Sequence, residues 1–585
     1  MITKPYLKAQ LRKALCTALE QAFPELSQTQ IEITLSNRPD SADYQCNSAM
    51  KLAKSVNLNP LDFAKKWCDH LPTSELIEEI FITGAGFINI RLRDAFIEKH
   101  LGSIYKSPRL GVNSKDYQNQ KIVLDFSSPN IAKQMHVGHL RSTIIGDAIA
   151  RLFEFLGAEV LRLNHVGDWG TQFGMLIAYL KRYHSNVLNG KSTANLEDLS
   201  QWYKASKVCF DEDIDFKNQA QREVTALQNG APESLAAWKL ICEISRKSYE
   251  EIYQLLEVNL IERGESFYNP YLFELVEDLT NKNLLTVSDG AKCIFLPGFI
   301  TRENTPLPLI IQKSDGGFNY ASTDMAAMRY RTQQDGATRI IILTDAGQAL
   351  HFDMVSKGAE TAGYLQKNNG EKVRFDHVPF GLMLDETGKK IKTRSGESEP
   401  LMSLIQNAIT ASEKIIRERG NHSFLEENEI RNLAKTLGIN AIKYADLSSN
   451  RTSDYKFSYE RMLRFEGNTA AFLMYSYVRI LSIKQKIGFR DLSDTLFKIT
   501  HPSERLLALH ILHFDEVILQ FSEDLLPHRL CEYLYQLAEK FNVFFRDCRV
   551  EGSKEEQSRL LLAEIVRKIL FTGMQLLGLK MVEKM

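Results

Sequence analysis

The chain has 585 residues, which is more than a single hydrophobic core supports, so we expect three or four domains. Its net charge of −1, with 44% hydrophobic and 25% charged residues, is typical of an ordinary soluble globular protein. This balance argues against non-specific polyanion binding as the main activity, although a basic face on one domain would suffice to bind RNA.

No two of the eight cysteines are spaced as Cys-x-x-Cys, which argues against a zinc knuckle or a redox dithiol. The first residues lack the apolar core of a secretory signal, and we find no uninterrupted apolar run of about 18 residues. We therefore expect a cytoplasmic protein with reduced cysteines and no membrane span.

The first hundred residues mix helical and strand-like patterns, which we interpret as a small α+β module that ends near residue 105. A stretch rich in Ser, Lys, Pro, Gly and Asn follows over residues 105–120 and is typical of a linker. The predicted helices of the module cover residues 6–23, 45–55 and 60–70, and its predicted strands cover 31–34 and 87–92.

A different pattern begins with a short apolar run that predicts a buried parallel strand over residues 121–126. A helix over 139–156 follows, because apolar residues recur along one face and Gly157 supplies a stop. Further strands are predicted at 159–164 and 339–344. Strand, loop, helix, glycine and strand make a βαβ unit, so we predict an α/β fold with a Rossmann-type parallel sheet.

The rest of the chain is mostly helical. Residues from about 180 to 290 are polar and helical, which we interpret as an insertion into the nucleotide-binding fold. From about residue 400 onward, Leu-rich amphipathic segments predict helices alone. The four predicted parts are an N-terminal α+β module (1–108), a catalytic nucleotide-binding domain (109–395), a connecting segment (396–450) and an all-helical domain (451–585).

The loop after the first parallel strand carries the strongest chemical signal, because it ends in His136-Val137-Gly138-His139. Histidines three residues apart at the start of a helix can both face the open edge of the sheet, where the helix amides favour phosphate. Gly138 lets a nucleotide approach the backbone, and imidazole N–H groups can stabilise charge on a leaving pyrophosphate. A pair of surface histidines is the alternative, but the position directly after a buried strand favours a nucleotide site.

The run from Gly388 to Gly396 is strongly basic and is suited to closing on a triphosphate. Basic loops are usually just solvated, but together with the histidines this loop is a candidate second half of an ATP site. We expect ATP contacts from His136, Gly138, His139, Lys390 and Lys392, and catalytic roles for His136, His139 and Lys390.

These motifs resemble a known family. His136–His139 resembles the His-Ile-Gly-His motif of class I aminoacyl-tRNA synthetases, and Lys390–Thr393 resembles their Lys-Met-Ser-Lys loop. The runs 43–50, 125–174, 392–396 and 583–585 resemble arginyl-tRNA synthetases in particular, and the similarity covers essentially the whole chain. It implies that the chain activates L-arginine with ATP to arginyl-adenylate and transfers the arginyl group to the 3′ end of tRNA(Arg), releasing AMP and diphosphate.

A guanidinium group presents a rigid fork of donors, so its site needs carboxylates and amides in fixed positions. Tyr320 and Asp324 share one face if residues 319–329 are helical, and Gln348 and His351 follow the strand that ends at Thr344. The resemblance places the arginine side chain between Tyr320 and Asp324, and it places the backbone of the amino acid near Asp125, Asn130 and Gln348. Many relatives carry glutamate at the position of Asp125.

The lysine loop departs from the family-wide motif, because Lys392 stands where the motif has serine and Thr393 stands where it has its last lysine. Charge in the transition state must still be balanced. Among arginyl enzymes a lysine just before the histidine motif is thought to substitute, and Lys133 is the matching position here. We therefore add Lys133 to the expected catalytic residues as a hypothesis.

The helical C-terminal region carries tyrosines close to arginines, a combination that can stack on unpaired bases and bind phosphates. An aromatic stripe on a helix is more often part of a core. The resemblance to an anticodon-binding bundle favours tRNA contacts at Tyr475 and at the terminal Met585. It also implies that residues 396–450 contact the tRNA stem and that the N-terminal module holds the D-loop.

The resemblance further implies Mg²⁺ bound with ATP, no zinc or other metal site on the protein, a monomer, and an activation step that requires bound tRNA(Arg). Three alternatives are a small nucleotidyltransferase, another class I synthetase such as the cysteinyl type, and a non-catalytic RNA-binding paralogue. The first would not need the long helical C-terminus, the second would be expected to show zinc-binding cysteines, and the third would have lost the ATP residues.

Overall fold

The computed structural model describes residues 6–36, 38, 41–391, 399–419, 426–488 and 490–585. The chain divides into two compact units, one of Met1–Asp116 with Leu463–Met585 and one of Tyr117–Met462. Among the described residues, no helix is both long enough and apolar enough to cross a membrane.

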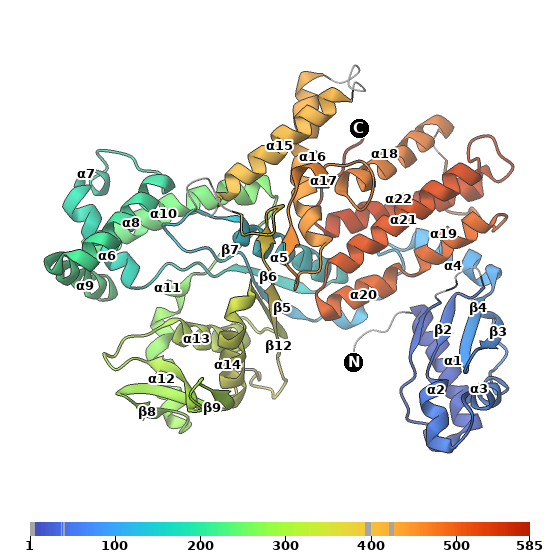
Figure 1. Cartoon of the computed structure of the whole chain (residues 1–585), viewed down its shortest axis with the longest axis horizontal. Helices are drawn as coiled ribbons and strands as arrows, with labels where there is room; N and C mark the ends of the chain where they lie inside the picture. The colour runs from blue at the N-terminus through green and yellow to red at the C-terminus, as the bar shows by residue number, and fades with distance from the viewer. Residues whose placement is uncertain (1–5, 37, 39–40, 392–398, 420–425, 489) are drawn as a thin grey trace. The chain divides into compact units, whose positions relative to one another are not determined.

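The second unit is built on a five-stranded sheet in which all neighbouring strands are parallel (Figure 1). The predicted Rossmann-type α/β fold and its three predicted strands are therefore confirmed. The two additional strands, β7 and β12, are the edge strands. In spatial order the sheet consists of β12 (Arg374–Phe380), β11 (Arg339–Asp345), β5 (Lys121–Asp125), β6 (Glu159–Asn164) and β7 (Ile261–Glu262).

The helix after β5 is α5 (Val137–Leu156), which begins two residues before the predicted start and ends at Gly157 as predicted. Gly157 adopts a left-handed backbone with φ of 93°, the conformation that favours glycine after a helix. Gly146 lets α5 pack closely on the strand, because a Cβ there would lie 2.2 Å from the ring of Phe126. The first turn of α5 is thereby fixed at the carboxyl end of β5.

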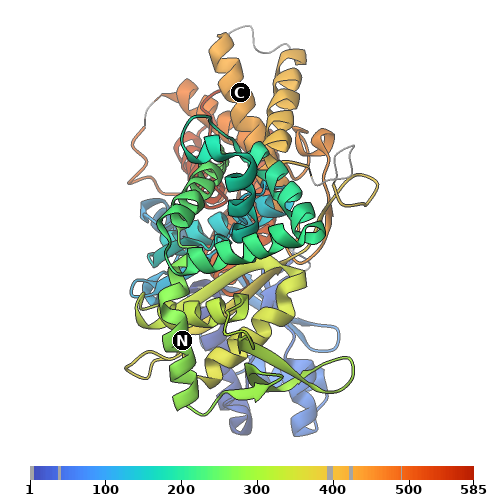
Figure 2. The ribbon, with the colours of Figure 1, turned by 90° about the vertical axis from the view of Figure 1, so that its left-hand side faces the viewer.

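A helical insertion over residues 171–255 separates β6 from β7 and appears as the group of green helices in Figure 2. It ends earlier than the predicted insertion over about 180–290, because β7 and β8 fall within the predicted range. The antiparallel three-stranded sheet that follows it was not predicted, because its strands lack a clear alternation of apolar and polar residues. The insertion helices are α6 (Thr171–Tyr183), α7 (Ser185–Leu188), α8 (Leu196–Glu212), α9 (Ile214–Gln228) and α10 (Pro232–Leu255); next come α11 (Glu265–Tyr268), α12 (Leu272–Asn281), β8 (Thr286–Ser288), β9 (Ala291–Ile300) and β10 (Pro306–Gln312).

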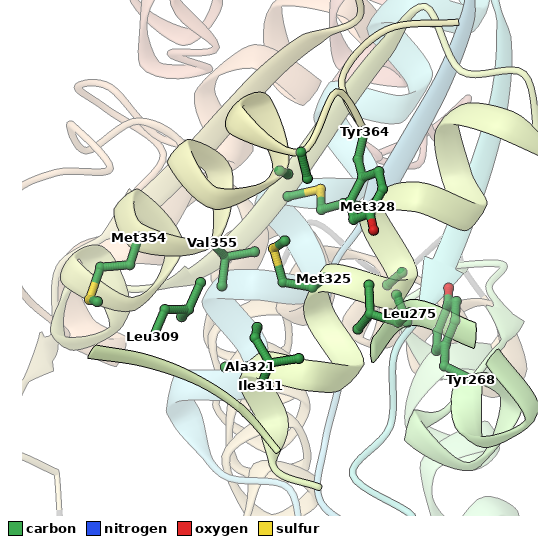
Figure 3. Packing of buried hydrophobic residues seen from close by; sticks show 14 of the residues in the cluster. Tyr268, Leu275, Leu309, Ile311, Ala321, Met325, Met328, Met354, Val355 and Tyr364 are labelled. Atoms are coloured by element: carbon green, nitrogen blue, oxygen red, sulfur yellow. The ribbon is translucent and has the colours of Figure 1, made fainter. Parts of the chain in front are cut away.

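A buried cluster fixes helix α13 (Tyr320–Gln333) between this small sheet and α14 (Ala349–Thr361). Figure 3 shows Met325 between Leu309 and Val355 on one side and Leu275 on the other. Asn319 caps the helix by accepting a hydrogen bond from the backbone N–H of Ser322. Because one face of α13 is held in this core, the residues on the other face are presented at fixed positions.

The second unit closes with a pair of long helices and a short parallel strand pair that holds the start of the lysine loop. The long helices pack on each other and on α5. These elements are β13 (Met383–Leu384), α15 (Leu401–Glu418), α16 (Glu427–Leu447), β14 (Tyr455–Lys456) and α17 (Tyr459–Met462).

The first unit combines an antiparallel sheet in the order β1-β2-β4-β3 with helices from both ends of the chain (Figure 1). The helices predicted at 6–23 and 60–70 and both predicted strands are present. The helix predicted over 45–55 starts too early, because residues 44–46 form the strand β2 and the helix α2 begins at Ala49. The elements β2, β3 and α4 were not predicted. Its elements are α1 (Tyr6–Ala22), β1 (Ile33–Leu35), β2 (Tyr44–Cys46), α2 (Ala49–Leu52), α3 (Pro60–Cys68), β3 (Ile77–Thr83), β4 (Phe87–Leu92), α4 (Asp94–Lys106), α18 (Ala470–Ile487), α19 (Pro502–Leu512), α20 (Phe514–Asp524), α21 (His528–Asp547) and α22 (Glu556–Leu576).

A buried ion pair joins the two chain segments of this unit. The Arg505 guanidinium donates to both carboxylate oxygens of Asp43 at 2.9 and 3.0 Å, and the Asp43 side chain is 1% exposed. Asp43 also accepts a 2.7 Å hydrogen bond from the backbone N–H of Leu92. The predicted boundary at residue 108 remains a prediction, as do those at 395 and 450.

We predict that Arg505→Met lowers the free energy of unfolding of the first unit by about 3–5 kcal/mol, because it leaves the buried Asp43 carboxylate without its cation. Hydrogen-exchange mass spectrometry of peptides from β2 and α19 in increasing urea measures this loss. The control is Arg546→Met, whose side chain is 73% exposed beside Asp547 and whose removal should leave the stability almost unchanged. Equal stability of the two variants would contradict the prediction.

Candidate active site

A pocket of about 800 Å³ opens at the carboxyl edge of the parallel sheet, where the strand order reverses between β5 and β11. The chain leaves β5 for β6 on one side and later returns to β11 on the other, which is where ligands bind in open α/β sheets. The predicted site residues that line the pocket are Asp125, Asn130, His136, Gly138, His139, Tyr320, Asp324, Gln348 and Lys390.

The two histidines of the signature loop form a reciprocal cap at the start of α5. The backbone N–H of Gly138 donates to Nδ1 of His136, and the backbone N–H of His136 donates to Nδ1 of His139, both at 3.1 Å. The ring centroids lie 4.1 Å apart. A Cβ on Gly138 would lie 3.0 Å from the His136 ring, so glycine here leaves room for the cap.

This cap fixes the protonation of both rings. Because each Nδ1 accepts a hydrogen bond, a neutral ring must carry its proton on Nε2. Burial and the charge of Lys133 lower the pKa of His136, and burial and the neighbouring His136 lower the pKa of His139 to about 3. At neutral pH both side chains are therefore neutral donors whose Nε2–H groups are available to a ligand in the pocket.

One wall of the pocket is acidic and aromatic. Tyr320 and Asp324 lie one turn apart on α13, as predicted, and the Asp324 carboxylate lies 2.6 Å from Nε2 of His351. The Tyr320 ring packs edge-on against His351 at 4.8 Å and is 65% exposed. Burial, together with Asp324 and Asp168, raises the pKa of Glu265 to about 8. This wall offers carboxylates to a cation.

Asp125 lines the pocket but already has partners in the chain. Its carboxylate accepts from Arg331 at 2.6 Å and from the Ser128 hydroxyl at 2.8 Å. Burial raises the pKa of Asp125, but Arg331, His165 and Ser128 outweigh it, so the pKa lies below its ordinary value and the side chain is ionised. Any contact between Asp125 and a substrate remains a prediction.

The two amide residues line the pocket from the loops after different strands. Asn130 follows β5, and its Oδ1 lies so close to the backbone of Gly167 that a Cβ there would be 2.3 Å away. Gln348 ends the short turn after β11, where its Nε2 donates to Asp345 at 3.4 Å. Both amides are on the surface that a ligand would contact.

The three lysines expected at the site do not all line the pocket. Lys390 lines the pocket, in the segment that follows β13. Lys133 is exposed and is not part of the lining; its ammonium lies 5.3 Å from the centroid of the Tyr203 ring. Lys392 lies outside the described residues, as does the rest of its run as far as Gly396.

A buried arginine connects the histidine motif to the lysine segment. Arg141 lies on α5 directly after the motif and pairs with Asp446 of α16 at 2.9 Å, with both side chains at most 1% exposed. Its guanidinium also donates to the backbone oxygens of Ser453 and Arg451. The strand β14, two residues further along, pairs with β13. Arg141 is thus one link between the two halves of the pocket.

Three family models match nearly all of the chain. The catalytic domain of class I (R) tRNA synthetases matches residues 100–459, the arginyl-tRNA synthetase N-terminal domain matches 9–92, and the DALR anticodon binding domain matches 473–585.

The chain belongs to the class I arginyl-tRNA synthetases.

Known proteins that are similar to this chain match it over nearly their full length. The arginine–tRNA ligase of Protochlamydia amoebophila is 53% identical over 576 residues, covering 97% of this chain and 98% of the relative, and that of Nostoc punctiforme is 48% identical with both chains covered completely. The crystal structure of arginyl-tRNA synthetase from Plasmodium falciparum superimposes with a TM-score of 0.86 at 33% identity, covering both chains completely. The arginyl-tRNA synthetase of Thermus thermophilus shares the fold, with a TM-score of 0.79 at 23% identity, covering 98% of this chain and all of the other.

The predicted tRNA-binding residues lie in the first unit, in the part that matches the anticodon binding domain. Tyr475 is 42% exposed on α18 and accepts a 3.1 Å hydrogen bond from Arg479, whose guanidinium also lies 4.9 Å from its ring centroid. Met585 is the half-buried last residue. An exposed tyrosine beside an arginine is available for stacking on a base.

Sequence reasoning missed four residues of the second unit that shape the pocket. Each carries a charge or an imidazole. Two of them fall within the run 125–174 that resembles the family, but their partners come from other elements of the fold, so no local pattern marks them as part of the pocket. Only the sheet and the pocket walls bring them together. They are Arg141, His165, Glu265 and Arg331.

We predict that His139 stays neutral, with its proton on Nε2, from pH 7.5 down to pH 5. The burial that lowers its pKa to about 3 penalises the charged form. Long-range ¹H–¹⁵N spectra of the imidazoles, assigned by comparison with His139→Asn, measure the protonation of each nitrogen. Uptake of a proton by His139 near the ordinary histidine pKa would contradict the prediction.

Proposed function

We propose that this pocket catalyses both steps of arginine–tRNA ligation, the reaction of the family. The observation that supports this most directly is that one pocket combines two neutral histidine donors at a helix N-terminus with an acidic wall. The first group suits a triphosphate, and the second suits a guanidinium.

In the first step the carboxylate of L-arginine attacks the α-phosphorus of ATP. A new P–O bond forms, the bond to the pyrophosphate breaks, and arginyl-adenylate results. The Nε2–H groups of His136 and His139 donate to phosphate oxygens as negative charge moves onto the leaving group. Gly138, Lys390 and Lys392 contact ATP, and Lys133 and Lys390 balance the charge of the transition state.

The acidic wall selects the side chain of the amino acid. Tyr320 and Asp324 bind the guanidinium, and Glu265 adds a second carboxylate to the same wall. Asp125, Asn130 and Gln348 hold the ammonium and carboxylate groups of arginine. A charge-assisted hydrogen bond contributes about 1.5–3 kcal/mol, so losing two or three of them rejects most other amino acids without an editing site.

In the second step the terminal ribose hydroxyl of tRNA(Arg) attacks the carbonyl carbon of the adenylate and releases AMP. No nucleophilic side chain is required, so catalysis consists of positioning and charge stabilisation. Tyr475 and Met585 contact the tRNA. Mg²⁺ accompanies ATP without a dedicated protein site or zinc, and the enzyme acts as a cytoplasmic monomer.

The test of this function is aminoacylation of total tRNA with each amino acid in turn. We expect the chain to charge tRNA(Arg) with arginine and to require ATP, because the carboxylate is unreactive until it is adenylated. Acid-gel separation of charged tRNA, followed by sequencing of the charged species, measures the outcome. Charging with any other amino acid, or no charging at all, would overturn the proposal.

We predict that the KM for arginine falls about tenfold between pH 7 and 9. The Glu265 carboxyl has a pKa of about 8 and must lose its proton to pair with a guanidinium, so binding strengthens as the pH rises through that value. Glu265→Gln should remove most of this dependence. The matched control is Glu277→Gln on the exposed side of α12, which should keep it; a wild-type KM that does not change with pH would refute the role of Glu265.

A further inference from the structure

One helix of the insertion presents a row of buried hydroxyl groups to the signature loop. Ser245, Tyr249 and Tyr253 are four residues apart on α10, so they share one face. Their exposed fractions are 0%, 2% and 8%. The resemblance to the synthetase family assigned no role to these residues, and they do not line the pocket.

All three hydroxyls bond to the loop between β5 and α5. The Tyr249 hydroxyl donates to two backbone oxygens, that of Asn130 at 2.7 Å and that of Lys133 at 2.8 Å. Ser245 donates to its own helix at Ile241 and accepts from the backbone N–H of Ala132 at 3.0 Å. α10 therefore contacts the loop on both sides of Ala132.

Tyr253 extends this row toward the start of the loop. The Asn164 amide donates to the Tyr253 hydroxyl at 3.2 Å. The Tyr253 hydroxyl and Ser127 Oγ lie 2.8 Å apart and share a hydrogen bond in which either hydroxyl can be the donor. Burial raises the pKa values of both Tyr249 and Tyr253, so both hydroxyls stay protonated at neutral pH.

The loop needs such support because its backbone is unfavourable. Ser127, Ser128 and Ala132 have φ angles of 72°, 46° and 61°, a left-handed region that residues with a Cβ rarely adopt. The hydrogen bonds of Ser127 and Ala132 described above come from α10. Strained segments persist only where the surrounding structure determines them.

Of the three hydroxyl residues, Tyr249 has the most direct connection to the residues of the pocket. Its hydroxyl joins the carbonyl of Asn130, whose amide lines the pocket, to the carbonyl of Lys133, whose charge lowers the pKa values of both His136 and His139. Ser200 of α8 adds a hydrogen bond from its hydroxyl to the Ala132 carbonyl at 3.3 Å. The insertion thus holds the segment from which substrate-facing side chains project.

We propose that Tyr249 is a positioning residue for the adenylation step, holding Asn130 and Lys133 at their working distances from the reacting groups. The inference rests on the proposed function of the pocket and adds the insertion helix α10 to the machinery that orients it. Ser245 and Tyr253 support the same loop on either side. A hydroxyl needed only for packing would contribute to stability and leave the rate of chemistry unchanged.

The test compares Tyr249→Phe with Tyr364→Phe, because each removes a single buried hydroxyl from the same unit. Tyr364 is 0% exposed, donates to Asp278 and lies outside the pocket lining. Arginine-dependent ATP–pyrophosphate exchange with tRNA(Arg) present gives kcat and the KM for ATP, and thermal unfolding gives the midpoint. We expect kcat of Tyr249→Phe to fall about 10- to 100-fold with a much smaller change in KM, while Tyr364→Phe keeps wild-type kcat.

A double-variant cycle separates positioning from general loosening. If Tyr249 acts partly through Lys133, the variant carrying both Tyr249→Phe and Lys133→Ala should lose less than the product of the two single losses. Should Tyr249→Phe fold poorly, Ser245→Ala removes the acceptor of the Ala132 N–H and should lower kcat in the same direction. Wild-type kcat in folded Tyr249→Phe, or an equal loss in Tyr364→Phe, would overturn the proposal. A wild-type enzyme with no arginine-dependent exchange would overturn the proposed function itself.

Discussion

The pocket depends on the ion pair between Arg141 and Asp446, two side chains that are almost completely withdrawn from water. Breaking such a pair leaves an uncompensated buried charge, which is far more costly than losing an exposed pair. Arg141 follows the histidine motif directly, and Asp446 lies near the end of α16. Through the carbonyls of Arg451 and Ser453, the same guanidinium reaches the chain that pairs with the lysine segment. The pair is thus one of the links that hold the histidine motif next to the segment of Lys390.

In the pocket, burial determines which side chains are charged as much as neighbouring charges do. The histidines are neutral because desolvation lowers their pKa values, so they act as oriented donors that do not repel Lys390. Burial and Asp324 raise the pKa of Glu265 to about 8, so this carboxyl is mostly protonated at neutral pH. Arg331, in contrast, keeps the Asp125 carboxylate ionised. A cation in this pocket would favour the ionised form of Glu265, so cation binding and loss of that proton are coupled.

Elements with a strong local signal were predicted well. The strand at 121–126 and the helix that ends at Gly157 combine apolar periodicity with a glycine stop, and both are present. The strands β2 and β3 and the sheet of β8 to β10 were missed, because strands without a clear alternation of polar and apolar residues take their register from their neighbours. Of the predicted lysine motif, Lys390 and Ile391 fall on the described residues and line the pocket.

The sequence by itself determined the family and located the loop that carries the histidine motif, because this motif is a continuous run whose residues lie within a few positions of one another. The tertiary structure decided which distant residues share the pocket. Arg331 meets Asp125 across 206 positions, and Tyr249 reaches the carbonyl of Asn130 across 119. Long-range pairs of this kind leave no periodic pattern in the sequence, since Arg331 and Tyr249 alone resemble ordinary helical residues.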